Sequence, residues 1–513
     1  MLSTVFSSTV VGIEAFTVEV EVDISNGLPA FNMVGLPDAA CRESADRVRA
    51  AIKNSGFPFP SKKITVNLAP ADLKKEGSAF DLAIAIGILV ANEIIPAASV
   101  ENKVFCGELA LDGKLRPVAG ILPRAAGLLA SGQLKDFFVP FMNAREALCV
   151  RDITVYAIRT FFQLVQFLKK EIELSPGEYV PIGPPPEKIF RKYPDFADVK
   201  GQAQAKRALE IAAAGGHNVL MIGPPGSGKT MLAKRVPSIL SAINFDEAIE
   251  TTKIHSVAGV LPQKSAPLQT PPFRDPHHTI SHVAMVGGGR YPKPGEVSLA
   301  HHGVLFLDEL AEFRRDVLEV LRQPLEDGRV TISRAASSLT LPARFMLVAA
   351  MNPCPCGYHT DLKRECHCSP IQIRNYLSKI SGPLLDRMDI QLEVPRLKVE
   401  EIAAKGTSEP STAIRKRVES ARAFQRERYQ EESITFNCQL EPNRIEKYCP
   451  VTTEGEKLLQ MAIRELGFSA RAYHKSLKVA RTIADLEKCA VIEASHISEA
   501  IHYRTLDCRR WDY

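Results

Sequence analysis

The feature that most constrains the fold of this 513-residue chain is a glycine-rich loop, Gly223-Pro224-Pro225-Gly226-Ser227-Gly228-Lys229-Thr230. It follows the apolar residues 217–222, which are typical of a strand, and precedes residues 231–240, which have a helical pattern. The spacing is G-x-x-x-x-G-K-[ST], in which backbone N–H groups and a helix N-terminus surround phosphate oxygens. We therefore predict a nucleotide site, with Lys229 on the β- and γ-phosphates and Thr230 on Mg²⁺. The alternative is a strand-to-helix turn that contains Lys-Thr by chance.

Length and composition set the remaining limits. A chain of this size is expected to form about three domains. The net charge of +5 permits a nucleic-acid partner without arguing for one. No apolar run approaches the roughly 20 residues of a membrane span, and no signal-peptide pattern opens the chain, so we expect no membrane and a cytoplasmic location. The 11 cysteines have no disulfide-framework spacing over most of the chain, which indicates reduced thiols.

The first third of the chain has the pattern of an α+β domain, assigned to residues 1–170. Residues 16–24 alternate strictly between apolar and polar, as in a half-buried strand. Residues 37–54 are helical in pattern, residues 64–70 form a second expected strand, and residues 78–92 a buried helix.

Two motifs in this domain, in residues 75–81 and 107–121, resemble the proteolytic domain of Lon-type proteases. That family cleaves peptides with a Ser-Lys dyad. The matching positions hold Ala79 and Leu122, so we expect no peptide hydrolysis. Ser78 lies one position from the serine site and has no evident base. The resemblance therefore implies a scaffold or a surface for a partner.

A proline-rich stretch over residues 171–195 is predicted to be an interdomain linker, because such a run cannot continue a helix. The ATPase core is assigned to residues 196–398. Residues 399–513 are helical in pattern and are assigned to a C-terminal lid.

Two further apolar runs in the core end in polar side chains that suit a nucleotide site. Residues 303–307 lead into Asp308 and Glu309, and residues 344–351 lead into Asn352. Open α/β sheets bind ligands at the carboxyl ends of their strands. We predict that Asp308 holds the Mg²⁺ shell and Glu309 polarises the attacking water. The alternatives are a solvated acidic turn and an asparagine that caps the turn before a proline.

These motifs and their order resemble the AAA+ ATPases. Residues 198–202 are similar to the segment on the adenine side of the site in that family. The resemblance implies that Asn352 orients the water near the γ-phosphate. It also implies a neighbouring subunit that completes the site.

The resemblance also assigns roles to two arginines, of which Arg387 carries the implied contact with a neighbouring subunit. Arg387 matches the arginine finger, which projects into the neighbouring subunit's site and neutralises transition-state charge. Arg471 matches the lid arginine that contacts the γ-phosphate of its own chain, with Arg481 as the competing candidate. In the alternative interpretation Arg387 pairs with Asp386 or Asp389 at the surface, and the lid arginines are solvated.

The residues between Thr230 and Asp308 exceed the needs of a minimal core. Segments 272–302 and 326–334 resemble the inserts of the helix-2-insert branch, which includes magnesium chelatase and the MCM helicases, and the second is predicted to be a hairpin around Gly328. In that branch the inserts line a central pore. Basic side chains there would follow a phosphate backbone or remain solvated: Arg274, Arg290, Lys293, Arg329 and Arg334.

A cysteine cluster follows Asn352 directly. Its members are Cys354, Cys356, Cys366 and Cys368, in a short loop with two C-x-C pairs. Four thiolates suit tetrahedral Zn²⁺, and we favour a structural zinc site. Free thiols remain the alternative, and His367 is a substitute ligand.

Over essentially the whole chain the ordered motifs resemble the ComM/YifB family of magnesium-chelatase-like ATPases. The resemblance implies an α/β protein, with an AAA+ P-loop core and a C-terminal helical lid after an α+β Lon-protease-like domain that lacks its catalytic dyad. It implies a hexameric helicase that uses ATP and Mg²⁺, binds single-stranded or branched DNA and promotes branch migration of recombination intermediates in natural transformation. Recombination proteins are candidate partners.

Two other functions stay open. A magnesium-chelatase-type motor would drive metal insertion or remodel a protein partner, and would respond to that partner instead of DNA. An integrin-like metal-binding domain is missing from this chain. An ATP-dependent protease is opposed by Ala79 and Leu122.

Overall fold

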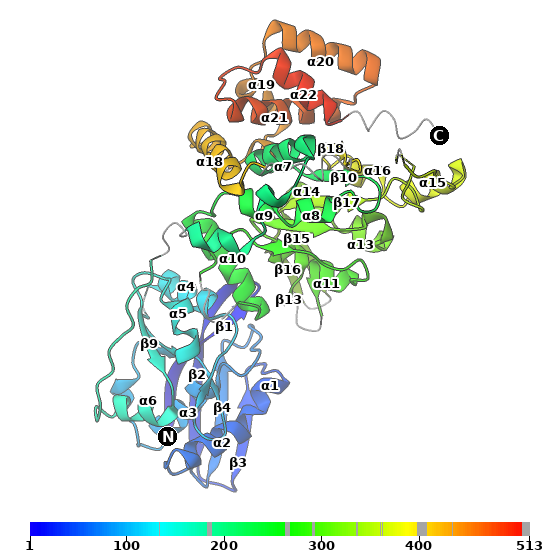
Figure 1. Cartoon of the computed structure of the whole chain (residues 1–513). Helices are drawn as coiled ribbons and strands as arrows, with labels where there is room; N and C mark the ends of the chain where they lie inside the picture. The colour runs from blue at the N-terminus through cyan, green and yellow to red at the C-terminus, as the bar shows by residue number, and fades with distance from the viewer. Residues whose placement is uncertain are drawn as a thin grey trace. The chain divides into compact units, whose positions relative to one another are not determined.

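The computed structural model divides into two units, which Figure 1 colours along the chain. Residues 1–183 and 245–268 form the first unit, and residues 184–244 and 269–513 form the second. The boundary falls inside the stretch 171–195 that the sequence marks as a linker, of which residues 182–186 lie outside the described residues. The structure describes residues 1–132, 134–181, 187–261, 267–289, 293–334, 337–359, 361, 363–397, 408–432 and 434–504.

The first unit contains a seven-stranded sheet in the order β3-β4-β2-β1-β5-β8-β9. Its strands are β1 (Leu2–Val11), β2 (Glu14–Ser25), β3 (Ala30–Val34), β4 (Lys63–Ala69), β5 (Lys103–Phe105), β8 (Asp136–Pro140) and β9 (Thr154–Ile158). The alternation predicted over residues 16–24 is confirmed in β2 from Val18 onward, because Val18, Val20 and Val22 are fully buried, whereas Phe16 is exposed. These valines share one hydrophobic cluster with the apolar side chains of residues 81–91.

The helix predicted over residues 78–92 is α3 (Asp81–Ala91), which is buried at every position and packs against β1 and β2. The remaining helices of this unit are α1 (Ala39–Arg42), α2 (Ser44–Asn54), α4 (Ile121–Ser131), α5 (Ala144–Ala147) and α6 (Phe161–Leu168). A short hairpin joins β6 (Glu108–Leu109) to β7 (Leu115–Arg116).

Helix α10 (Phe245–Ala258) also packs in the first unit, although the sequence places it in the ATPase core. It lies against α4. The amide of Gly120 donates a hydrogen bond to the carbonyl of Ser256 at 3.2 Å, and the Ser256 hydroxyl donates to the buried carboxylate of Glu146. These contacts are distant in sequence, so a local pattern does not reveal them.

The second unit has a five-stranded parallel sheet in the order β11-β14-β17-β10-β18. Its strands are β10 (Val219–Ile222), β11 (Phe273–Arg274), β14 (Val304–Leu307), β17 (Met346–Met351) and β18 (Ile390–Glu393). Every residue of β10, β14 and β17 is buried, which explains their continuous apolar sequences. Helices α7 (Ala203–Gly215), α8 (Lys229–Ala233) and α9 (Val236–Ile239) accompany this sheet. The predicted α/β P-loop core is therefore confirmed.

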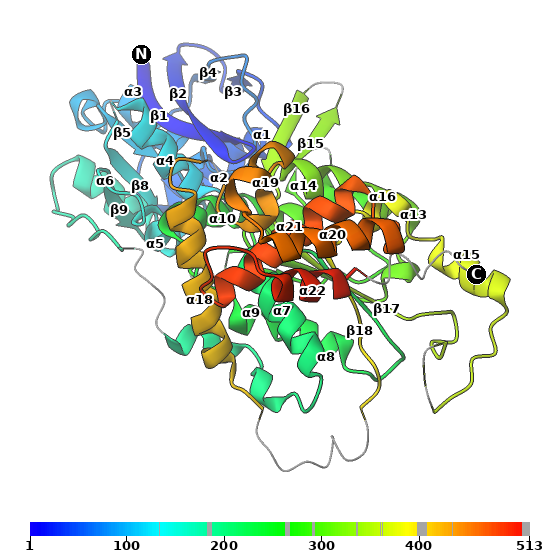
Figure 2. The ribbon, with the colours of Figure 1, turned by 90° about the horizontal axis from the view of Figure 1, so that it is seen from above.

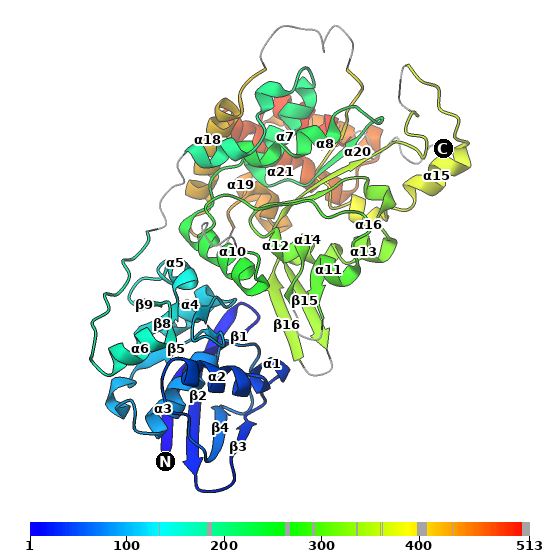
Figure 3. The ribbon, with the colours of Figure 1, turned by 60° about the horizontal axis from the view of Figure 1, so that its bottom comes forward.

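A long hairpin extends from this core, as Figure 3 shows. Its strands are β15 (Arg329–Arg334) and β16 (Ser337–Pro342). The prediction of a turn at Gly328 is wrong, because Gly328 adopts φ +65° at the end of α14 (Arg322–Asp327). Glycine in that left-handed conformation is a common helix stop. Other insert elements are α11 (His282–Val286), β12 (Gly287–Gly288), β13 (Lys293–Pro294) and α12 (Glu296–Leu299), and α13 (Arg315–Glu319) lies between the two inserts.

The C-terminal residues form the predicted helical region. Its helices are α18 (Ser411–Arg428), α19 (Pro442–Tyr448), α20 (Thr453–Leu466), α21 (Ala470–Leu486) and α22 (Ala494–His502). Both α18 and α21 pack against α7, and Figure 2 shows the group from above. Two short helices, α15 (Pro370–Leu377) and α16 (Gly382–Leu385), precede β18. Among the described residues, no helix combines the length and apolar character that crossing a bilayer requires.

Candidate active site

The phosphate loop connects β10 to α8 and has a backbone that only glycine accommodates at two positions. Gly228 adopts φ +95°, a conformation that other residues rarely reach. A Cβ atom at Gly223 would lie 2.1 Å from the carbonyl oxygen of Val394. The glycines that define the sequence motif are therefore required by the shape of the loop.

Lys229 lies folded into this cradle. Its Nζ donates hydrogen bonds to the carbonyls of Gly223 at 2.7 Å and Pro224 at 3.0 Å, and to Oδ1 of Asn352 at 3.3 Å. Burial lowers the pKa of Lys229 to about 8, although the charges of Asp308 and Glu309 oppose the shift. The structure thus brings together the predicted phosphate lysine and the predicted water-orienting asparagine. Phosphate oxygens would replace the two carbonyls as partners of the ammonium group.

Thr230 and Asp308 also meet. The Thr230 hydroxyl donates to Oδ2 of Asp308 at 2.6 Å, which joins the first turn of α8 to the end of β14. A hydroxyl and a carboxylate at this distance are the pair of oxygen ligands that Mg²⁺ uses beside a nucleotide. The donor set therefore fits Mg²⁺ held together with the phosphates of ATP.

Glu309 follows Asp308 and is 57% exposed at its side chain. Its backbone adopts φ +51°, which is uncommon outside glycine. Its carboxylate lies 3.4 Å from Nδ1 of His278. A carboxylate beside the Thr230–Asp308 pair can polarise a water molecule, and His278 is positioned to orient that carboxylate.

Gln202 is a residue whose role the sequence did not reveal. It precedes α7 with φ +53°, and its Nε2 donates to the carbonyls of Ser227 at 3.2 Å and Pro395 at 2.8 Å. Gln202 therefore ties the phosphate loop to the segment after β18. The signal available in the sequence was its place at the end of the segment 198–202.

Arg387 and Arg471 lie together at Glu326. Arg387 donates to the carboxylate of Glu326 and, at 2.8 Å, to the carbonyl of Pro383. Arg471 lies 3.8 Å from Glu326 and donates to Asp386 at 3.1 Å. The structure therefore gives both arginines acidic partners at one place on the second unit.

The competing lid arginine, Arg481, is fully buried within the C-terminal helices. It contacts Asp485 at 3.0 Å and donates to the carbonyls of Cys489 and Ala490. A guanidinium with these partners stabilises the lid itself. Arg471 is thus the lid arginine that remains near the surface.

The insert cations have mixed environments. Arg274 forms a two-pronged ion pair with Glu296, at 2.6 and 2.7 Å, so its charge is already compensated. Lys293 and Arg329 are exposed. Arg290 and the side chain of Arg334 lie outside the described residues.

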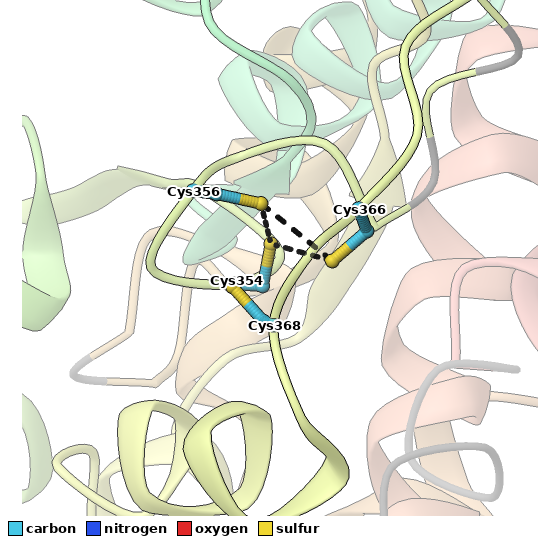
Figure 4. A group of neighbouring side chains, drawn as sticks. All are labelled: Cys354, Cys356, Cys366 and Cys368. Atoms are coloured by element: carbon cyan, nitrogen blue, oxygen red, sulfur yellow. Dashed lines mark hydrogen bonds between the residues drawn. The ribbon is translucent and has the colours of Figure 1, made fainter.

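The four loop cysteines converge, as Figure 4 shows. Their sulfur atoms lie within 4.8 Å of one another, with Cys354 Sγ 3.3 Å from Cys356 and 3.6 Å from Cys366. Four thiolates about 2.3 Å from one tetrahedral Zn²⁺ would lie about 3.8 Å apart. The donor set and its spacing therefore fit zinc, while His367 is exposed and outside the group.

The protease-like positions of the first unit hold no dyad. Ala79 and Leu122 are both buried and apolar. The hydroxyl of Ser78 donates to the carboxylate of Glu108, which also lies 3.4 Å from Arg116. Ser78 is thus engaged by an acid that a nearby cation compensates.

The chain is similar to known proteins over nearly all of its length. Family models match residues 20–143 (Subunit ChlI of Mg-chelatase), 195–402 (Magnesium chelatase, subunit ChlI) and 408–504 (Magnesium chelatase, subunit ChlI C-terminal). Competence protein ComM of Haemophilus influenzae is 45% identical over 98% of both chains. The uncharacterised protein YifB of Escherichia coli is 43% identical over 99% of this chain and 97% of its own. Lon protease 2 of Bacillus subtilis is 29% identical over 35% of this chain and 36% of its own.

Proposed function

We propose that this chain, which belongs to the ComM/YifB family of magnesium-chelatase-like AAA+ ATPases, is a motor that moves DNA strands. In this proposal six copies form a ring, and ATP hydrolysis drives branch migration of recombination intermediates during natural transformation. The family and the P-loop core establish an ATPase. The DNA substrate is supported by the name of the competence relative and by the exposed cations of the inserts.

The pairing of Thr230 with Asp308 carries the catalytic part of the proposal. With Lys229 beside Asn352, it supplies the magnesium and phosphate contacts of one half of an ATPase site. Bound ATP and Mg²⁺ supply the reacting phosphoryl group and its charge compensation. Glu309 orients the attacking water, and Gln202 holds the phosphate loop in place.

Arg387 and Arg471 supply the other half of a site. Both arginines contact the carboxylate of Glu326, so we assign both to the same nucleotide, that of the neighbouring subunit. This assignment replaces the same-chain contact expected for Arg471. Glu326 then competes with the incoming γ-phosphate for both cations.

We also propose that Cys354, Cys356, Cys366 and Cys368 hold a structural Zn²⁺. The convergence of their four sulfur atoms supports it. A chelatase-type motor remains the second candidate, because the family models that match all carry that name.

ATP hydrolysis measured with three additions separates the two candidates. The additions are forked DNA, single-stranded DNA and the partner subunits of a magnesium chelatase. Stimulation by either DNA supports the motor proposed here. Stimulation by the chelatase subunits alone would replace it with the second candidate.

A further inference from the structure

The cysteine loop makes direct contact with the phosphate loop. Gly357 lies between Cys356 and Cys366 and adopts φ +84°. A Cβ atom at this position would lie 2.6 Å from Cδ of Pro225, the third residue of the phosphate loop. The backbone of Gly357 therefore lies so close to the ring of Pro225 that a side chain at position 357 would collide with it.

A second contact reaches the same proline from the far part of the cysteine loop. Arg396 donates to the carbonyl of Pro225 at 3.4 Å and lies 3.3 Å from Oδ2 of Asp361. The Asp361 side chain is 1% exposed, so its charge is compensated inside the protein. Arg396 thereby links the cysteine loop to the outer edge of the nucleotide cradle.

A third connection between the cysteine loop and the phosphate loop runs along the chain, through the end of β17. Cys354 is buried and lies two residues after Asn352, whose side chain accepts a hydrogen bond from Lys229. The other three cysteines are only partly buried. The loop therefore has little apolar core of its own, and a metal ion would supply the closure that fixes its shape.

We propose that a thiophilic divalent cation, Zn²⁺, bound by the four cysteines sets the nucleotide affinity of the phosphate loop. This inference rests on the zinc site proposed above. With the ion bound, Gly357 and Arg396 hold Pro225 in the position that shapes the cradle. Without the ion, the cysteine loop opens and Pro225 loses its contacts with Gly357 and Arg396. The phosphate loop then has the shape that binds nucleotide in a smaller fraction of molecules.

The coupling has a measurable size. If about one molecule in ten retains a competent cradle without the ion, the apparent dissociation constant of the nucleotide rises about tenfold. Linkage requires the reverse effect as well, so bound nucleotide raises the affinity of the four cysteines for the ion by the same factor.

The test uses the full chain, with bound zinc measured by metal analysis and affinity measured with a fluorescent ADP analogue in the presence of Mg²⁺. Cys366→Ser combined with Cys368→Ser is expected to lose zinc and to bind ADP about tenfold more weakly. Asp361→Asn removes the charge that holds Arg396, and is expected to keep zinc while weakening ADP binding. Lys363→Ala, at an exposed position of the same loop, is the matched control and is expected to keep both properties.

Unchanged ADP affinity in the double cysteine variant after loss of zinc overturns the inference, as does wild-type protein that binds no zinc. Normal ADP affinity in Asp361→Asn would contradict the part of the inference in which Arg396 connects the cysteine loop to Pro225. ADP binding needs no DNA, so these results are independent of the motor function. Failure of that function would appear instead as hydrolysis that DNA does not stimulate.

Discussion

Arg387 donates a hydrogen bond to the carboxylate of Glu326, the same carboxylate that Arg471 approaches at 3.8 Å. The predicted arginine finger is therefore neutralised within its own chain. In a ring, the phosphates of the neighbouring nucleotide would have to displace Glu326. In the proposed ring, the strength of these contacts to Glu326 would set how readily Arg387 and Arg471 reach that nucleotide.

Replacement of Glu326 by Gln is expected to raise ATP hydrolysis. A partly exposed Arg-Glu pair is worth about 0.2–1 kcal/mol, so its loss should increase the rate of hydrolysis by a factor of about 1.4 to 5 at protein concentrations too low to complete the ring. Glu319→Gln, which removes the ion pair with Arg322, is the matched control. A slower Glu326→Gln enzyme would mean that the acid positions the arginines instead of restraining them.

Mixing two inactive variants tests whether Arg387 acts on a neighbour. Arg387→Ala and Lys229→Ala should each abolish hydrolysis, because each lacks one half of the site. In a random one-to-one mixture about a quarter of the interfaces combine an intact Lys229 with an intact Arg387, and activity should return in proportion.

The control for this mixture pairs Lys229→Ala with Glu309→Gln. Both changes lie in the same half of the site, so no interface is complete and no activity should return. Equal behaviour of the two mixtures would contradict an arginine finger at Arg387.

The lowered pKa of Lys229 predicts how nucleotide affinity depends on pH. The ammonium group is present in the nucleotide-free site below about pH 8 and is lost as the pH rises through that value. Because phosphate binding needs the charge, ATP should bind about tenfold more weakly at pH 9 than at pH 7. Titrations with a fluorescent ATP analogue over this range measure it.

Two variants show whether Lys229 causes the pH dependence of ATP affinity. Lys229→Ala should bind weakly at every pH, without the fall above pH 8. Lys234→Ala, whose exposed side chain lies 3.6 Å from Asp275, should keep the wild-type profile. A wild-type affinity that stays flat through pH 9 contradicts the assigned role of burial.

Gln202→Ala should weaken ATP binding without unfolding the protein. Two hydrogen bonds of about 1 kcal/mol each hold the phosphate loop through this side chain, so affinity should fall about tenfold or more. Isothermal calorimetry of the Mg²⁺–ATP complex measures the change, and Gln204→Ala in the first turn of α7 is the control. Equal affinity in the two variants would limit Gln202 to a structural role.

The sequence predicted the elements whose information is local. The strands β10, β14 and β17 could be assigned because each is a continuous apolar run, and Asp308 and Asn352 because they follow such runs directly. Glycine geometry at Gly223 and Gly228 is likewise encoded in the loop itself.

The remainder depends on contacts between distant residues. The alternating residues around Gly328 suggested a hairpin turn at this glycine. Gly328 instead ends the helix α14, which precedes it. Glu326 contacts Arg387 and Arg471 although the three residues are far apart in the sequence, and no periodicity reports these contacts. The same holds for α10, whose partner Glu146 lies in the first unit.

Strand displacement on a forked DNA tests the central claim most directly. The wild-type chain with ATP and Mg²⁺ should separate or migrate the branch, whereas Glu309→Gln should bind ATP and DNA without moving the strands. Strand movement that persists in Glu309→Gln, or a wild-type chain that hydrolyses ATP and leaves the fork intact, would contradict a DNA motor driven from this site.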